Sequence, residues 1–291
     1  MSEELPASVS VSWLRDHLGE PGLVVVDAST HLTLPASGAY TVEPGRATYA
    51  AEHIPGALFA DLLTDFADPD SAQPWTVPTS ARFAAAAGAL GIGDGTRVVV
   101  YDQHDGYWAT RFWWQLRLEG FDAVAVLDGG LPAWRAAGNP VTDEPAVAAP
   151  ATFTAHRRPE LLRSTREVLA AVDDEKTVIV NVLDPETYRG ERSSYARNGH
   201  IPGSVNVPVA LIRDASGELK PVAELRALFA EAGLLDPAIT PVTYCGGGIA
   251  ATGVAHALAL AGRDDVAVYD GSLTAWTADE SLPLVTGPNP R

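Results

Sequence analysis

The sequence repeats itself, and this repeat restricts the folds that the chain can adopt. Three motifs recur in the same order: His-Ile-Pro-Gly at 53–56 and 200–203, a β-type run at 97–102 and 241–245, and Asp-Gly-Gly-Leu-Pro-Ala-Trp at 128–134 matched by Asp-Gly-Ser-Leu-Thr-Ala-Trp at 270–276. The separation between the copies is nearly constant, which chance does not produce. The repeat predicts one fold used twice.

Each half alternates short β-type runs with helical segments, which predicts an α/β fold with a mostly parallel sheet and helices on both faces. We expect strands near 23–27, 57–59, 97–101, 123–127, 177–182, 204–206, 240–244 and 266–269. We expect helices near 9–18, 80–90, 107–119, 131–137, 164–171, 222–232, 249–261 and 273–277. A Pro/Ala-rich stretch at 143–152 predicts a linker, so the expected domains are 1–145 and 155–291.

The composition excludes several classes of function. With a formal net charge of −17 over 291 residues, the chain does not have the basic character that a nucleic-acid partner requires. No apolar run reaches the roughly 18 residues of a membrane span, and the first residues show no signal-peptide pattern, so we expect a cytoplasmic protein. A single cysteine cannot form an intramolecular disulfide, which agrees with a reducing compartment.

Cys245, the only cysteine, lies where a β-type run meets three glycines and then an Ala/Leu-rich helical segment. A glycine turn at a helix start aims several backbone N–H groups at one point, and the helix adds positive potential there. A sulfur atom at that point is stabilised as a thiolate, which is a nucleophile. The alternative is a small buried hydrophobe, but a packing residue needs no glycine turn. We therefore expect Cys245 to be catalytic.

These motifs resemble the rhodanese family of sulfurtransferases, and the resemblance covers nearly the whole chain. Tandem members of the family carry an inactive N-terminal copy and an active C-terminal copy. Here Asp102 stands at the first-half position that matches Cys245. The resemblance therefore implies two tandem rhodanese-like domains, of which the second is active.

The resemblance also implies a mechanism without a metal or another cofactor. Cys245 attacks the outer sulfur of a small-molecule donor and holds it as a persulfide, and a thiol, cyanide or a thioredoxin-like reductant then accepts it. The loop that would bind the persulfide through its backbone N–H groups consists of Gly246, Gly247, Gly248, Ile249 and Ala250.

The loop composition favours 3-mercaptopyruvate over thiosulfate as the donor. Thiosulfate is a compact dianion, and the loops of its enzymes resemble a Cys-Arg-Lys-Gly pattern, whereas Gly246 and Gly247 stand here. Mercaptopyruvate enzymes tend toward Cys-Gly-Ser-Gly. The serine given a proton-relay role in that subfamily is Gly247 in this chain, and Ala250 replaces a hydroxyl residue. Thiosulfate remains the alternative donor.

A donor carboxylate also needs a cation. The family takes arginines from the segment before the second His-Ile-Pro-Gly, and its Gly-Arg-Phe arginine falls here on Thr187. Arg189, Arg192 and Arg197 lie in that segment. We favour Arg189 and Arg197 as ligands of the donor, with solvated surface arginines as the alternative.

His53 is the second candidate catalytic residue. In mercaptopyruvate enzymes the matching histidine lies near the active loop, which implies that His53 passes a proton to the leaving enolate. Glu43 is a candidate acid behind it. Alternatively, His53 and His200 each pin the turn before the proline that follows shortly after.

Other interpretations of the same residues come from different classes of protein. A cysteine phosphatase needs an arginine six positions after the cysteine, and Ala251 stands there, so the phosphate-binding cation is missing. A persulfide carrier without turnover, or an interaction protein with two inactive copies, remains as an alternative. His104 and Asp105 resemble part of a metal site but have no third ligand at useful spacing, so we expect no metal.

Overall fold

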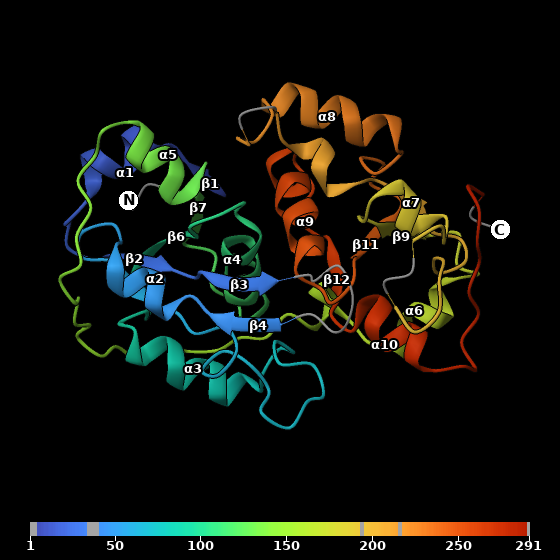
Figure 1. The fold of residues 1–291 in the computed structure, drawn as a ribbon, viewed down its shortest axis with the longest axis horizontal. Helices are drawn as coiled ribbons and strands as arrows, with labels where there is room; N and C mark the ends of the chain where they lie inside the picture. The colour runs from blue at the N-terminus through green and yellow to red at the C-terminus, as the bar shows by residue number, and fades with distance from the viewer. Residues whose placement is uncertain (1–4, 34–40, 193–194, 215–216, 290–291) are drawn as a thin grey trace. The chain divides into compact units, whose positions relative to one another are not determined.

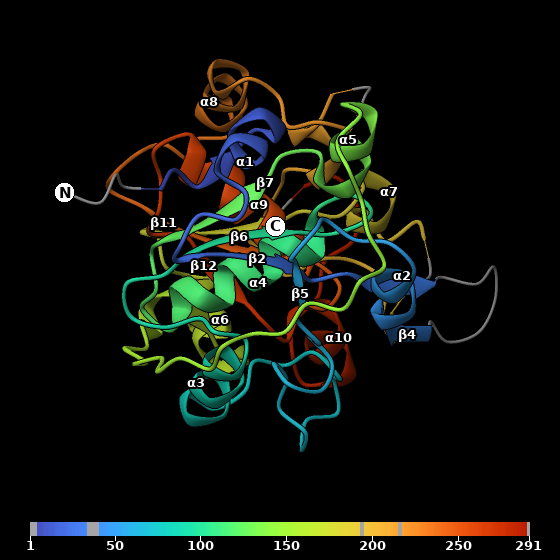
Figure 2. The same ribbon diagram turned by 90° about the vertical axis from the view of Figure 1, so that its left-hand side faces the viewer.

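The structure is a computed structural model that describes residues 5–33, 41–192, 195–214 and 217–289. It divides into two compact units, Met1–Arg157 and Arg158–Arg291. Each unit contains its own parallel sheet and its own apolar core (Figure 1, Figure 2). The duplicated α/β fold that the repeat predicts is therefore confirmed.

The first unit is built around a five-stranded parallel sheet. Its strands are β1 (Ser8–Val9), β2 (Leu23–Asp27), β5 (Leu58–Phe59), β6 (Arg97–Tyr101) and β7 (Val124–Leu127), and a separate antiparallel pair is formed by β3 (Thr30–Thr33) and β4 (Thr41–Pro44). Its helices are α1 (Val11–His17), α2 (Arg46–Ala51), α3 (Ser80–Ala89), α4 (Tyr107–Leu118) and α5 (Gly130–Ala136). The strand order is β1-β7-β6-β2-β5, which places the apolar β6 in the middle.

The second unit repeats this arrangement. Its strands are β8 (Leu162–Arg163), β9 (Thr177–Asn181), β10 (Val205–Asn206), β11 (Thr240–Tyr244) and β12 (Ala267–Tyr269). Its helices are α6 (Thr165–Ala171), α7 (Pro185–Tyr188), α8 (Val222–Glu231), α9 (Ala250–Leu260) and α10 (Ser272–Ala278), with the 3-10 helices η1 (Pro159–Leu161) and η2 (Val209–Ile212). All neighbouring strands are parallel, and the order β10-β9-β11-β12-β8 is that of the first sheet read from its other edge.

The repeat extends to a buried tyrosine at the end of each middle strand. Tyr101 accepts the N–H of Ile54 on its hydroxyl oxygen at 3.2 Å. Tyr244 accepts the N–H of Ile201 in the same way at 3.1 Å. Both tyrosines are fully buried. The His-Ile-Pro-Gly motif of each half is thus fastened to the middle strand of its own sheet.

Helices cover both faces of each sheet (Figure 1, Figure 2). In the first unit, α1 and α5 place Leu14 and Trp134 in one core, while α4 lies against β6 and β7 from the other side. In the second unit, α6 and α10 place Val168 and Trp276 in the corresponding core, while α9 lies against β11 and β12. Burial on both faces explains why the inner strands are continuous apolar runs.

The stretch that contains the predicted linker lies against the first unit. Ala151 donates its N–H to the carbonyl of Gly88 at 2.9 Å, and a Cβ on Gly88 would lie 2.5 Å from the Ala151 carbonyl oxygen. His156 donates its N–H to the carbonyl of Glu119 at 2.8 Å. Arg157 forms an ion pair with the buried Glu119 carboxylate. These contacts fix the chain to the first unit as far as Arg157.

Candidate active site

Cys245 directly follows β11, the middle strand of the second sheet, and precedes α9. The carboxyl ends of parallel strands meet at one edge of a sheet, where open α/β sheets bind their ligands. The residue is 3% exposed, so the sulfur is held within the fold. The predicted nucleophile therefore stands at the edge of the sheet where a bound ligand can reach it.

The glycine loop after Cys245 turns its backbone toward the sulfur. Gly248 has a φ of +81°, which favours glycine, and it donates its N–H to Cys245 Sγ at 3.1 Å. α9 begins at Ala250, with Ile249 at its N-cap. The sulfur therefore accepts a backbone N–H within the loop that leads into this 11-residue helix.

Ser272 fixes the backbone of Cys245 from the start of α10. Cys245 donates its N–H to Ser272 Oγ at 3.1 Å, and the Ser272 hydroxyl donates to the carbonyl of Tyr269 at 2.8 Å. Ser272 has a φ of +48°, the sole positive φ at a non-glycine residue in the part of the chain that the structure describes. Its counterpart in the first unit is Gly130, with a φ of +56°. A strained residue beside the nucleophile indicates a positioning role.

Thr274 and Leu273 hold the first two peptides of the loop. The N–H and the hydroxyl of Thr274 both donate to the carbonyl of Gly246, at 2.9 and 2.7 Å. Leu273 donates its N–H to the carbonyl of Cys245 at 3.1 Å. The loop is therefore anchored to the first turn of α10. No local sequence pattern predicts this set of residues, although serine replaces glycine at this position of the third repeat motif.

The matching position of the first unit shows what this loop geometry can bind. The Asp102 side chain is fully buried and accepts four backbone N–H groups. Oδ1 accepts those of His104 and Gly106, both at 2.9 Å. Oδ2 accepts those of Trp108 and Ala109, both at 3.1 Å. A loop of this kind after the middle strand surrounds a negatively charged group with amide donors.

His53 is bound on both ring nitrogens by the first unit. Nδ1 lies 2.7 Å from the carbonyl oxygen of Tyr49, and Nε2 lies 3.1 Å from that of Glu144. The residue is fully buried. His200 is held through one ring nitrogen, because its Nδ1 lies 2.8 Å from the carbonyl oxygen of Tyr188. These contacts favour the turn-pinning role, and proton transfer by His53 stays a prediction.

The predicted donor-binding arginines are engaged with the protein itself. Arg189 makes two hydrogen bonds of 2.7 Å to the Glu191 carboxylate, and Arg192 pairs with Glu186 in the same surface region. Arg197 donates to the backbone carbonyls of Trp276, Thr277, Asp279 and Leu282, at 2.7 to 3.1 Å. These bonds favour a structural role for Arg197. Arg189 can exchange its exposed partner for a donor, because a surface ion pair contributes little.

Tyr195 lies against the active-site loop, and no sequence pattern predicts this contact. A Cβ built on Gly246 would overlap the phenol oxygen of Tyr195 and would lie 3.0 Å from its Cζ. The ring is partly buried against the core of the second unit. The residue next to the nucleophile is therefore in contact with a tyrosine from the segment before the second His-Ile-Pro-Gly motif.

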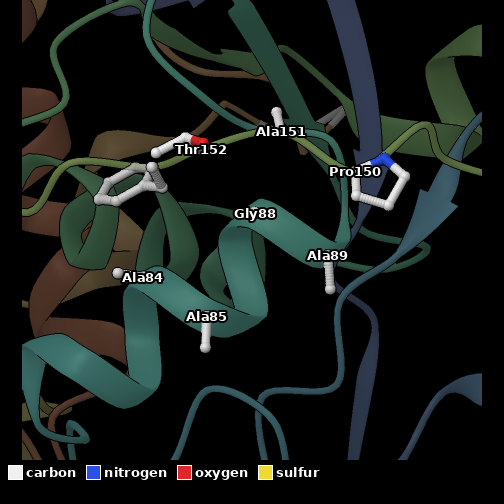
Figure 3. Close-up of a pocket in the computed structure, with 8 residues that line it drawn as sticks. Ala84, Ala85, Gly88, Ala89, Pro150, Ala151 and Thr152 are labelled. Atoms are coloured by element: carbon white, nitrogen blue, oxygen red, sulfur yellow. The ribbon is translucent and has the colours of Figure 1, made fainter.

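Two features of the first unit offer no comparable chemistry. A surface pocket lies between α3 and residues 150–153, and its lining has no titratable side chain and a single polar one, Thr152 (Figure 3). His104 Nε2 lies 2.9 Å from His31 Nδ1. Within the described ranges, no three His, Cys, Asp or Glu side chains are grouped as metal ligands would be.

Comparison with known proteins agrees with this arrangement. The rhodanese-like domain family matches residues 10–137 and 164–279. The chain belongs to the rhodanese family. It is 35% identical to thiosulfate/3-mercaptopyruvate sulfurtransferase 2 of Arabidopsis thaliana over 95% of this chain and 86% of that protein. It is 36% identical to thiosulfate sulfurtransferase of Bos taurus and 34% identical to 3-mercaptopyruvate sulfurtransferase of Homo sapiens, in both cases over 93% of this chain and 91% of the relative.

Solved structures show the same rhodanese architecture. SseA from Escherichia coli, described as a 3-mercaptopyruvate sulfotransferase, superposes with a TM-score of 0.78 at 31% identity, over 92% of this chain and 98% of that one. Wild-type EanB superposes with a TM-score of 0.81 at 23% identity, over 97% of this chain and 69% of that one, which shows the fold alone. The rhodanese chain described here is therefore a tandem-domain sulfurtransferase of the thiosulfate/3-mercaptopyruvate type. Every helix in the described residues is too short or too polar to cross a membrane.

Proposed function

We propose that this rhodanese transfers sulfur from 3-mercaptopyruvate to a thiol or to cyanide through a persulfide on Cys245. The Cys245 thiolate attacks the donor sulfur, so that an S–S bond forms while the C–S bond of the donor breaks and pyruvate leaves as its enolate. The enolate takes up a proton, and the persulfide loses one. An acceptor thiolate or cyanide then attacks the terminal sulfur, the S–S bond breaks, and the Cys245 thiolate is regenerated.

The observation that carries this proposal is the correspondence between Asp102 and Cys245. The charged oxygens of an aspartate lie two bonds from Cβ, as does the terminal sulfur of a cysteine persulfide. In the first unit, four amides bind those oxygens at 2.9 to 3.1 Å. This geometry supports an equivalent ring of amides, from the glycine loop and the first turn of α9, around a persulfide on Cys245.

The choice of donor rests on the charge of the loop. Gly246 and Gly247 provide no side-chain cation. Backbone dipoles and Arg189, once it leaves Glu191, make a smaller positive potential than a loop with its own arginine and lysine. A monoanionic keto acid needs less positive potential for binding than a dianion does. Thiosulfate is the alternative donor, because the bovine thiosulfate sulfurtransferase is about as similar to this chain as the human mercaptopyruvate enzyme.

The proposal is tested by steady-state kinetics with both donors at equal acceptor concentration. We expect kcat/KM for 3-mercaptopyruvate to exceed that for thiosulfate by at least about tenfold, or about 1.4 kcal/mol in transition-state free energy. A ratio that favours thiosulfate would overturn the donor and leave the nucleophile standing. One turnover's worth of product without further cycles would favour the persulfide carrier.

The nucleophile is tested separately by mass spectrometry of the intact protein. Wild type mixed with donor should gain the mass of one sulfur atom and lose it on addition of dithiothreitol. Cys245→Ser should gain nothing, because a serine hydroxyl is not appreciably ionised near neutral pH and cannot hold a persulfide. An adduct that persists in Cys245→Ser would disprove the assignment.

A further inference from the structure

We infer that Tyr195 restricts which residues position 246 of the active-site loop can carry, because its phenol occupies the space where a side chain at that position would begin. The inference rests on the proposed sulfur transfer at Cys245. A Cβ on Gly246 would overlap Tyr195 Oη and would lie 3.0 Å from Cζ and 3.2 Å from Cε1. A side chain at position 246 therefore requires the Tyr195 ring to move, because the two would occupy the same space.

Both partners of this contact are held by α10 and its carboxyl end. Arg197, two residues after Tyr195, donates to carbonyls at and beyond the end of α10. Thr274, in the first turn of α10, binds the carbonyl of Gly246 through its N–H and its hydroxyl. These hydrogen bonds hold the loop backbone at Gly246 and the chain two residues after Tyr195. The contact between Tyr195 and Gly246 is therefore built into the packing of the second unit.

The contact limits which charged side chains could stand beside Cys245. Gly246 directly follows Cys245, so an arginine at 246 would bring a cation into the loop. Tyr195 occupies the start of that side chain's path with a neutral hydroxyl and an aromatic ring. A dianionic donor loses more than a keto acid when the cation is absent. Gly246 already carries no cation, so Tyr195 would act on donor choice only by limiting which residues can replace glycine there.

The test is a double-mutant cycle on the full chain. Gly246→Ala is made in wild type, in Tyr195→Phe and in Tyr195→Ala, and kcat/KM for 3-mercaptopyruvate and the Tm are measured. We expect Gly246→Ala to lower kcat/KM at least about tenfold in wild type and less than about twofold in Tyr195→Ala. The loss in Tyr195→Phe should be intermediate, because Cζ remains 3.0 Å from the new methyl group. The Tm losses should follow the same order.

A second variant tests how a cation at position 246 affects the choice of donor. Gly246→Arg combined with Tyr195→Ala should raise the ratio of kcat/KM for thiosulfate over 3-mercaptopyruvate at least about tenfold above wild type. Gly246→Arg alone should lose activity with both donors. Gly271→Ala is the matched control, because its Cβ would meet the Ala275 Cβ at 2.8 Å and not Tyr195. Tyr195→Ala should therefore not rescue it.

Equal losses from Gly246→Ala in all three backgrounds would overturn the inference. Full activity of Gly246→Arg with Tyr195 intact would overturn it as well. A wild-type protein that forms no persulfide with either donor would instead defeat the proposed function, and the coupling of the Tm values would still test the contact between Tyr195 and Gly246.

Discussion

Removal of the Asp102 carboxylate should destabilise the first unit far more than the same truncation at Cys245 destabilises the second. Asp102→Ala deprives four amides of the loop and of the first turn of α4 of their acceptor, in a fully buried place. At about 1 kcal/mol for each buried amide left unpaired, the low end of the measured range, the free energy of unfolding falls by about 4 kcal/mol. In a unit of about 150 residues, this lowers the Tm by about 10 °C.

Calorimetry measures the loss, and hydrogen exchange of the peptide 98–110 assigns it to the first unit. Cys245→Ala is the matched control. Its Sγ accepts the N–H of Gly248, and sulfur is a weak acceptor, so about 1 kcal/mol should be lost there. Formate should fit the space left in Asp102→Ala and, at ten times its Kd, restore about 1.4 kcal/mol without changing wild type. A Tm within about 2 °C of wild type, or an equal loss in Cys245→Ala, would refute the reasoning.

Further results are expected from residues at or near the two loops. Ser272→Gly relieves the strain of the φ of +48° and removes the hydroxyl that binds the Cys245 N–H. The Tm should therefore stay the same or rise, while kcat/KM falls at least about tenfold. Full activity with a lower Tm would count against a positioning role for Ser272. Asp102→Cys in a Cys245→Ser chain should give no more than trace sulfur transfer in a cyanide assay. The reason is that the loop after residue 102 has one glycine, whereas the loop after residue 245 has three. Restored turnover would contradict this expectation. Burial lowers the pKa of His200, so the unfolded state binds more protons than the folded state between that pKa and about 6.5. Urea denaturation should therefore show the free energy of unfolding falling as the pH drops through this window. The dependence on pH should be flatter in His200→Asn.

The inner strands could be predicted from the sequence because their signal is local. The expected bounds of 23–27, 97–101 and 240–244 are those of β2, β6 and β11, which are largely apolar runs covered on both faces. The edge strands β1 and β8 are two residues long and have no such run. They form because β7 and β12 offer them a hydrogen-bonding edge, and this edge exists only in the folded sheet.

The same distinction applies to the site. Cys245 could be predicted as the nucleophile because the strand, the cysteine, the glycines and the helix are contiguous in the sequence. Ser272 and Tyr195 reach the loop from separate segments, and no local pattern marks that contact. Arg197 shows the converse difficulty. A positive charge in the right segment predicts a donor ligand, and this stays a prediction, but the structure shows the Arg197 guanidinium donating to backbone carbonyls at and beyond the end of α10. Those carbonyls can accept hydrogen bonds from the Arg197 guanidinium only in the folded unit, where the end of α10 lies beside Arg197.

The two copies of the fold give a reason to expect that a cysteine alone would not make the loop reactive. In the first copy the anion is part of the chain, so the amide donors are satisfied when the fold forms and no ligand is needed. In the second copy, Cys245 Sγ is one bond from Cβ, and in the proposed mechanism the place of the Asp102 oxygens belongs to the second sulfur. The glycines at 246–248 keep side chains out of that place, and Ser272 holds the cysteine peptide at the expense of backbone strain. Reactivity in this fold is therefore a property of the whole loop and its anchors, which is why exchanging one residue between the copies should not transfer it.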